Sequence, residues 1–389
     1  MSAKRTLNSF RAPDERGAEE RAWEVVRAAY RERAPGGRRH AFARRAGVVA
    51  ASIVAVGVVA LSPAGATVGR LVDRALGVQH PAPGLFSLPA PGRILVSGAG
   101  GTWIVAANGS ARRIGAWRQA SWSPHGLYLT VAARDELAAV STRGVLQWTL
   151  IRPDVSDPRW YAPSGYRVAY LSGDELRDVA GDGTGDHLLA APVEHVAPAW
   201  RPGHPYQLAY VTAAGGLVVR DAGTGAKLWS ANPGVRVHEL AWSADGQRLL
   251  ALASTAVLLY AGDGRRLSTR PAPAGGSIVG GALSPDGRTL AVVTDGSSST
   301  VTVYSDIARH PVVRRVLAGL ELGQVAWSPN GQWVLVSWPA ADQWVFVRVA
   351  GKPRIAAVSR ISQQFSSRLT SARFPALEGW CCNARGAAG

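Results

Sequence analysis

The stretch from Val325 to Trp338, "VAWSPNGQWVLVSW", sets two apolar runs on either side of a short polar turn. Residues 328–331, Ser-Pro-Asn-Gly, fit a type I turn, because proline presets φ at the second position and glycine tolerates a left-handed backbone at the last. The residues around the turn alternate with the period of two that β-strands show. The second run is apolar on both faces, so the stretch predicts a hairpin in a sheet that packs between other sheets.

Variants of this hairpin recur along the chain, each starting from an aromatic residue or leucine that we call the anchor. The six anchors are Trp122, Trp160, Trp200, Trp242, Leu283 and Trp327. By subtraction, successive anchors lie 38, 40, 42, 41 and 44 residues apart. A period of about 40–45 residues with several short strands per unit is typical of β-propeller blades. Because the anchors hold equivalent positions, we expect them to pack blade against blade rather than to form a ligand cage.

Both ends of the repeat region contribute to one further predicted blade. Residues 92–115 hold three strands with no turn strand before them, and residues 372–380, "ARFPALEGW", offer that missing first strand, with Phe374 as its anchor. Residues 374–379 resemble the turn. Pairing the two segments leaves no unpaired strand edge in the ring. We therefore predict an all-β, seven-bladed β-propeller over residues 92–380, with six full blades and one composite closing blade.

The repeated Trp-Ser-Pro-Asp-Gly pattern resembles the TolB-like, or WD-like, β-propeller repeats of bacterial envelope proteins. Leu283 departs from the aromatic anchor, and the copies at Trp160 and Trp200 lack the Asp-Gly or Asn-Gly pair. The resemblance implies a fold and an extracytoplasmic compartment of the bacterial envelope. It implies no reaction.

An uncharged segment precedes the repeats. Residues 46–69 form a run of 24 residues without charge, which as a helix exceeds the roughly 30 Å hydrocarbon core of a bilayer. Four arginines between residues 38 and 45 precede it. The positive-inside rule then predicts a single-pass plasma-membrane protein with a cytoplasmic amino terminus and an extracytoplasmic propeller. A cleaved signal peptide is the alternative, because residues 64–66, Ala-Gly-Ala, suit a cleavage site; the long leader and long apolar run favour an uncleaved anchor. Residues 70–91 form a linker.

The cytoplasmic tail, residues 1–45, predicts one amphipathic helix. Trp23, Val26 and Tyr30 fall on one face at spacing i, i+3 and i+7. A lone helix of this length needs a partner to bury its tryptophan. One hypothesis is therefore docking of a cytoplasmic regulator, since a short tail, one span and an outer domain resemble the layout of membrane anti-sigma factors. The alternatives are a solvated tail and a helix that lies on anionic lipid.

Motifs for catalysis, cofactors and metals are missing from the sequence. It contains no G-x-S-x-G and no Gly-rich phosphate loop, and its eight histidines show no H-x-H or H-E-x-x-H spacing. Residues 181–187, "GDGTGDH", resemble a calcium loop but lack its terminal glutamate, so a hairpin turn is the better interpretation. We therefore expect no catalytic residues, no cofactor, no metal and no enzymatic activity.

Charge and cysteines give weaker information. The formal net charge is +16, but outside the tail it is spread along the chain, which disfavours a nucleic-acid partner.

Cys381 and Cys382 are the only cysteines, and they begin the carboxyl-terminal tail, residues 381–389. The Cα atoms of adjacent residues lie closer together than the Cα atoms of disulfide-bonded cysteines usually do, so a bond between these two cysteines would be strained. An intramolecular bond, a bridge between two molecules, and plain apolar packing all stay open.

These observations favour a binding module. The propeller would present loops to a protein, a peptide or an envelope glycan, and occupancy would be relayed through the span in the lipid bilayer to a cytoplasmic partner. One rival is a purely structural envelope scaffold. The other is an enzyme, such as a lyase or a glycan-active propeller, that uses the central channel. Carboxylates with histidine or arginine at one channel mouth would favour that enzyme, and an apolar channel would count against it.

Overall fold

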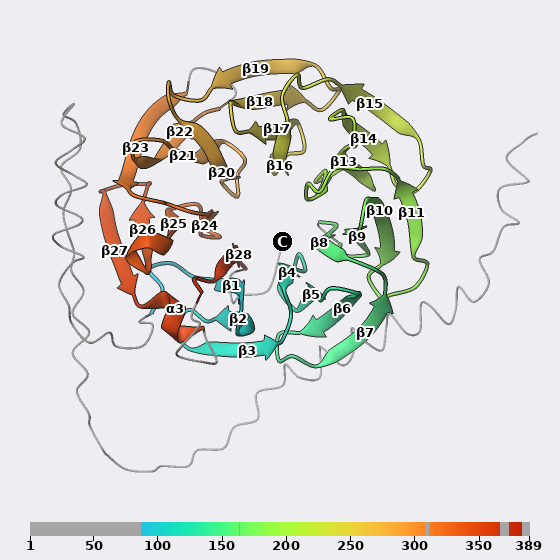
Figure 1. Cartoon of the computed structure of the whole chain (residues 1–389), viewed down its shortest axis with the longest axis horizontal. Helices are drawn as coiled ribbons and strands as arrows, with labels where there is room; N and C mark the ends of the chain where they lie inside the picture. The colour runs from blue at the N-terminus through green and yellow to red at the C-terminus, as the bar shows by residue number, and fades with distance from the viewer. Residues whose placement is uncertain (1–86, 163, 308–310, 366–372, 383–389) are drawn as a thin grey trace, which may run out of the picture. The chain divides into compact units, whose positions relative to one another are not determined.

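A computed structural model describes residues 87–162, 164–307, 311–365 and 373–382. These residues form seven four-stranded antiparallel sheets arranged as blades around a central axis (Figure 1). The prediction of an all-β, seven-bladed propeller is confirmed. The predicted tail helix with Trp23, Val26 and Tyr30, and the predicted span at 46–69, lie outside the described residues. Within the described ranges, no helix has the length and apolar character needed to cross a bilayer.

We number the blades 1 to 7 and give the strands of each from the axis outward. Blade 1 holds β4 (Gln119–Trp122), β5 (Tyr128–Ala132), β6 (Glu136–Ser141) and β7 (Leu146–Ile151); blade 2 holds β8 (Val155–Trp160), β9 (Arg167–Ser172), β10 (Glu175–Ala180) and β11 (His187–Ala190). Blade 3 holds β12 (Ala199–Trp200), β13 (Gln207–Val211), β14 (Leu217–Asp221) and β15 (Lys227–Ala231); blade 4 holds β16 (Val237–Trp242), β17 (Arg248–Ala253), β18 (Ala256–Ala261) and β19 (Arg266–Pro271). Blade 5 holds β20 (Ser277–Leu283), β21 (Thr289–Asp295), β22 (Ser299–Ser305) and β23 (Val312–Gly319); blade 6 holds β24 (Val325–Trp327), β25 (Trp333–Trp338), β26 (Gln343–Arg348) and β27 (Arg354–Ser359). Blade 7 holds β28 (Ala376–Cys381), β1 (Arg93–Gly98), β2 (Gly101–Val105) and β3 (Ala111–Gly115), and the short helices are η3 (Pro339–Ala341) and α3 (Ile361–Gln364).

The serine after each anchor fixes the turn that the sequence repeats. In blade 6, Ser328 accepts a hydrogen bond at its Oγ from the backbone N of Trp333 (3.0 Å) and donates one to Asn330 Oδ1 (2.7 Å). The backbone N of Gly331 donates to the carbonyl of Ser328, and Gly331 adopts φ +66°, which only glycine adopts without cost. The turn sets the register in which Trp327 pairs with Val334. The equivalent serine Oγ accepts the same backbone hydrogen bond in blades 1, 4 and 5.

The closing blade is composite, as predicted, but its first strand differs from the prediction. β28 pairs antiparallel with β1, and Trp380 lies opposite Ile94. This is the register position that the anchors hold in the other blades. Phe374 precedes the strand and packs partly buried against the core between blades 6 and 7. The prediction of Phe374 as anchor was wrong, because residues 376–379 form part of β28 instead of a turn. In the other blades a turn links the first strand to the second. In blade 7 no such turn exists, since β28 and β1 come from opposite ends of the repeat region.

The hydrophobic core is divided among the blade interfaces. The described residues form seven buried clusters, each drawn from two neighbouring blades. The cluster between blades 6 and 7 buries Trp344, Phe346 and Trp380, and α3 adds Ile361 to it. Because every sheet is covered on both faces, strands such as β25 are apolar on both faces, as the sequence predicts.

Candidate binding site at the mouth of the central channel

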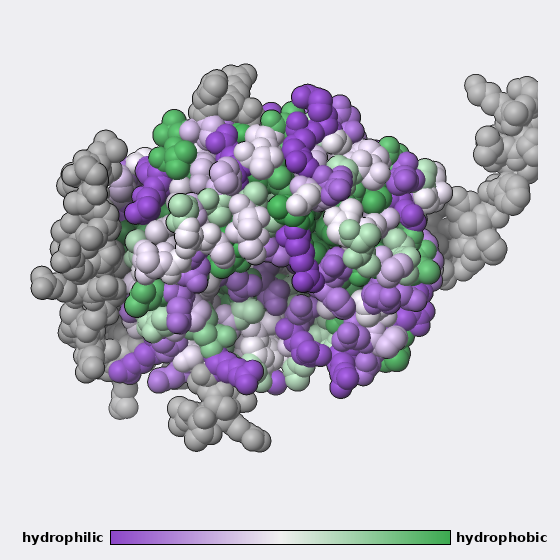
Figure 2. Space-filling view, turned by 45° about the horizontal axis from the view of Figure 1, so that its top comes forward, coloured by the Kyte–Doolittle hydropathy of each residue, from purple (hydrophilic) through white to green (hydrophobic). Residues whose placement is uncertain are grey.

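The loops that lead into the innermost strands of blades 3, 4 and 5 surround a cavity of about 440 Å³, which we call the mouth cavity. Its lining comes from residues 194–196 before β12, 236–238 at the start of β16, 254 in the β17–β18 turn, and 277–279 at the start of β20. Figure 2 shows a hollow near the middle of the molecule's face with hydrophilic side chains at its border. The cavity has the size of small-ligand sites in proteins.

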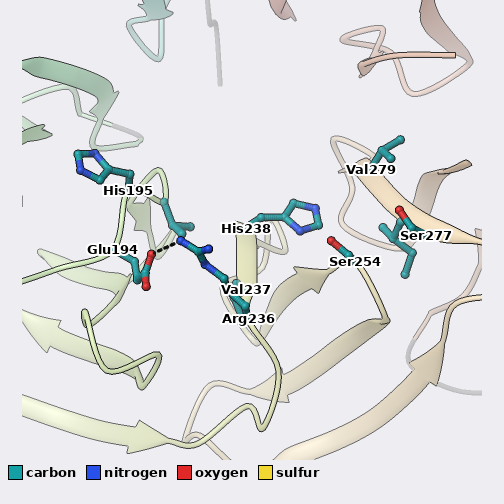
Figure 3. Close-up of a pocket in the computed structure, with 10 residues that line it drawn as sticks. Glu194, His195, Arg236, Val237, His238, Ser254, Ser277 and Val279 are labelled. Atoms are coloured by element: carbon teal, nitrogen blue, oxygen red, sulfur yellow. Dashed lines mark hydrogen bonds and ion pairs between the residues drawn. The ribbon is translucent and has the colours of Figure 1, made fainter. Parts of the chain in front are cut away.

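An ion pair marks one end of the mouth cavity. Arg236 Nη2 lies 3.0 Å from Glu194 Oε2 (Figure 3). The side chain of Arg236 is 84% exposed and that of Glu194 is 23% exposed. An exposed pair of this kind is worth little in stability. The guanidinium of Arg236 can therefore leave Glu194 and bind an incoming anionic group.

The opposite wall of the mouth cavity carries polar groups without partners. The imidazole of His238 and the hydroxyls of Ser254 and Ser277 make no side-chain hydrogen bond with the described residues, and Val279 beside them is 46% exposed. Burial lowers the pKa of His238, so its imidazole is neutral near pH 7 and offers one donor and one acceptor. These groups can bind a ligand that has both polar and apolar parts.

Two carboxyl groups lie on innermost strands, Glu239 beside His238 of the mouth cavity and Glu378 on blade 7. Burial raises the pKa of Glu239 on β16 and of Glu378 on β28 to about 7 each. Glu239 Oε2 accepts a hydrogen bond from the backbone N of Gly281 at 3.2 Å. The positive charge of Arg159 on β8 acts on both carboxyls and partly offsets the effect of burial. Both innermost-strand carboxyls therefore hold a proton at slightly acidic pH.

The repeat anchors lie outside the mouth cavity, at the far ends of the innermost strands. Three anchor indoles donate their Nε1–H to the preceding blade: Trp200 to Arg159 O (2.9 Å), Trp242 to Ala199 O (3.1 Å) and Trp327 to Ala282 O (2.8 Å). The indole nitrogens of Trp122 and Trp160 are buried without a hydrogen-bond partner in the described structure. Leu283 packs against the core between blades 4 and 5.

Arginines that the sequence analysis did not single out also connect blades at this end. Arg201 takes the position of the serine after anchor Trp200, and it reaches blade 4, where its guanidinium lies 4.9 Å from the ring centroid of Trp242. The guanidinium of Arg93 in blade 7 likewise lies over the ring of Trp122 in blade 1, 4.7 Å from the ring centroid. The sequence does contain a sign of this role, because Arg201 follows its anchor at a position where most other repeats have serine.

The "GDGTGDH" segment forms the connection between β10 and β11, as predicted. Its Asp186 accepts hydrogen bonds from Arg152, Arg177 and Tyr170, which hold the pKa of Asp186 below its usual value against the effect of burial. Within the described residues, no group of three or more His, Cys, Asp or Glu side chains could hold a metal ion. Cys381 and Cys382 are joined to each other by a disulfide.

The sequence analysis did not identify the residues of the mouth cavity. A count back from each anchor could have found part of the set, since His238 and Val279 each lie four positions before their anchors Trp242 and Leu283. That position marks the start of an innermost strand. Which face of the strand it occupies depends on a register that shifts at Val237/Glu239 and Ile278/Gly280, and such shifts are not readable from sequence.

No family model matches the chain, and no curated protein sequence matches it. Solved structures do resemble it. The β-propeller domain of Cps50 (Swd1) from Myceliophteria thermophila aligns with a TM-score of 0.51 and 13% identity, over 64% of this chain and 87% of that one. KlHsv2 with a replaced loop 6CD aligns at 0.52 and 13%, over 65% and 88%. A chain of a mitotic checkpoint complex aligns at 0.53 and 14%, over 72% and 93%. At these identities the likeness shows the propeller fold alone.

Proposed function

We propose that the propeller is a binding module that takes a short segment of a partner protein into the mouth cavity. The observation that carries this proposal is the group of unpartnered side chains, His238, Ser254 and Ser277, beside the exposed Val279. These side chains are open to solvent, so a peptide that enters can replace their water with direct hydrogen bonds. Arg236 adds a preference for an acidic side chain or a carboxylate, which would replace Glu194 as its partner.

The similar solved propellers agree with this proposal at the level of fold. One of them is part of a protein assembly, the mitotic checkpoint complex. A rigid ring that presents loops suits recognition, because binding orders few residues that were not already ordered. We expect the binding step to involve no chemistry.

The proposal is tested by site-specific photocrosslinking in cells that express the whole chain. A photoreactive residue at Val279 should capture a discrete partner, and the product should disappear when Arg236→Glu and His238→Ala are added. The matched control places the same residue at Val313, which is 57% exposed on β23, away from the cavity. Identical products from both positions, or products that survive the double change, would remove the mouth cavity as the binding site.

We also propose the layout that the sequence predicts: a single-pass plasma-membrane anchor at 46–69, an extracytoplasmic propeller, and a tail that passes occupancy to a cytoplasmic regulator. The apolar run and the arginines before it support this proposal. Deleting residues 1–36 should abolish a transcriptional response to ligand without changing ligand binding. A structural scaffold would tolerate the deletion, and a carboxyl-terminal reporter that is active inside the cell would reverse the proposed topology.

A second candidate function follows from the channel carboxyls. Glu239 and Glu378, with pKa values raised to about 7, stand near Arg159, and acid–base chemistry on a glycan needs such groups. His238 neighbours Glu239 in sequence. If the channel is catalytic, Glu239→Gln will stop turnover of an envelope glycan while ligand still binds. If the site only binds, the same change will leave the glycan intact in both proteins.

A further inference from the structure

The outer surface of the ring differs between blades. All of the exposed large apolar side chains among the described residues lie between Leu127 and Leu320, and most of them belong to the outer strands of blades 1 to 5. Examples are Ile151 on β7, at 67% exposure, and Val312 on β23, at 71%. None occurs in the described parts of blades 6 and 7. These two neighbouring blades (Figure 1) therefore present a different kind of surface.

Basic residues take the place of the apolar ones on blades 6 and 7. We use the name basic sector for five exposed side chains on and beside the outer strands β27 and β3: Arg112, Arg113, Lys352, Arg354 and Arg360. Residues 343–365 and 87–134 contain no aspartate or glutamate. The nearby Asp342 accepts hydrogen bonds from Ser362 (2.7 and 2.9 Å), and Glu378 lies on the innermost strand.

The cations of the basic sector are not neutralised within the described structure. Of the five, Arg113 alone donates a side-chain hydrogen bond, to the carbonyl of Gly100 at 2.7 Å, and none forms an ion pair with a described residue. Blade 2 shows the contrast, because its Arg152 and Arg177 both pair with Asp186. Uncompensated like charges on one surface raise the potential there and attract a polyanion.

We propose that the basic sector docks on an anionic phospholipid surface. The sector lies on the outer strands of the ring, and the mouth cavity is not part of it. The exposed large apolar side chains include one aromatic residue, Tyr166 of blade 2, so the sector offers no platform on which bases could stack. A broad basic surface without apolar residues matches electrostatic attraction to headgroups, in which each cation contributes roughly fivefold to binding.

The point at which the chain enters the ring favours lipid over a soluble polyanion. The backbone N of Leu88 donates to the carbonyl of Ala107 at 2.8 Å, which places the start of the described chain beside the β2–β3 turn of blade 7. The predicted span ends at residue 69, and the intervening residues 70–86 reach at most roughly 60 Å when extended. This step rests on the proposed anchor, whereas the charge argument stands without it.

The test places a fluorophore on the basic sector and measures its distance from lipid headgroups. Ala111→Cys, exposed on β3, is labelled in the full chain without reductant, since Cys381 and Cys382 are bonded to each other. Vesicles carry a headgroup quencher in phosphatidylcholine, with or without phosphatidylglycerol. We expect quenching with phosphatidylglycerol that is lost at high salt and lost in Arg112→Gln/Lys352→Gln/Arg354→Gln. A label at Ala226→Cys, exposed on blade 3, should not be quenched.

The matched control is Arg265→Gln/Arg270→Gln/Arg315→Gln, which removes three charges from blades 4 and 5 and should leave the quenching unchanged. Equal quenching in neutral and anionic vesicles, or equal loss in both triple variants, would overturn the proposal. So would tighter binding of a labelled oligonucleotide, abolished by the first triple variant, since the polyanion would then be nucleic acid. Flotation with neutral vesicles reports the proposed anchor separately, so its failure is distinguishable from failure of the basic sector.

Discussion

Arg201 of blade 3 donates a hydrogen bond from its Nε to the carbonyl oxygen of Gly246 in blade 4, at 2.6 Å. Its Nη1 also donates to Gln207 Oε1 (2.9 Å) and to the carbonyl of Gly262 (3.1 Å). The residue is 8% exposed. One side chain thus binds two turns of the next blade, at the end of the ring away from the mouth cavity.

Arg201→Ala should lower the free energy of unfolding by about 2–4 kcal/mol, because it leaves the buried carbonyl of Gly246 without its donor and removes one of the two donors to the carbonyl of Gly262, which keeps Trp229 Nε1. Urea titration followed by tryptophan fluorescence measures the change. Arg265→Ala, at an exposed position without side-chain partners, is the control and should stay within about 0.5 kcal/mol of the parent protein. Equal effects of the two changes would show that Arg201 does not connect the blades energetically.

The anchor tryptophans should differ in how much their indole N–H contributes. Trp327→Phe loses the bond to Ala282 O, whereas Trp122→Phe loses an N–H that has no partner in the described structure. We expect Trp327→Phe to cost about 1 kcal/mol more than Trp122→Phe. The midpoint of chemical denaturation compares them, and the reverse order would contradict the blade-to-blade hydrogen bond.

Glu239 should make the protein less stable as pH rises through the slightly acidic range. Its pKa is raised to about 7 in the folded state, above the unfolded value, so the folded protein holds a proton that the unfolded chain has released. Stability from this group is fully present below about pH 4.5 and is lost by about pH 7. Glu239→Gln should therefore match the parent at low pH and exceed it by at most roughly 3 kcal/mol at about pH 8. Denaturant titrations at both pH values measure the difference.

The control for this pH effect is an exposed acid. Asp263→Asn, at an exposed turn position, should give curves parallel to those of the parent at both pH values. A Glu239→Gln protein with the same pH profile as the parent would mean that the carboxyl is hydrated and titrates normally in the folded state.

Trp380 should be the residue on which ring closure depends. It is 7% exposed and its ring contacts Phe346 of blade 6 at 5.6 Å between centroids. Trp380→Ala should cost about 3–5 kcal/mol through the cavity it leaves, measured as the free energy of unfolding. Ala376→Ser, exposed at the start of the same strand, is the control. A small effect at Trp380 would mean that β28 adds little to the closed ring.

The sequence predicted the number of blades because one local unit, such as Trp327 and its turn, repeats with nearly constant spacing. The exact first strand of blade 7 escaped prediction, since its partner lies at the other end of the chain and residues 374–379 resemble a turn. The mouth cavity escaped for a different reason. His238 and Ser277 come from separate blades, and only the ring and its local register shifts bring them to one wall.

Ile94 and Trp380 are adjacent across β1 and β28, although 286 positions separate them by subtraction. A ribosome therefore produces β1 long before it produces the strand that covers it. While six blades are being made, β1 presents open backbone groups that can pair with another nascent chain. We expect variants that weaken β28 to be lost first to aggregation during synthesis.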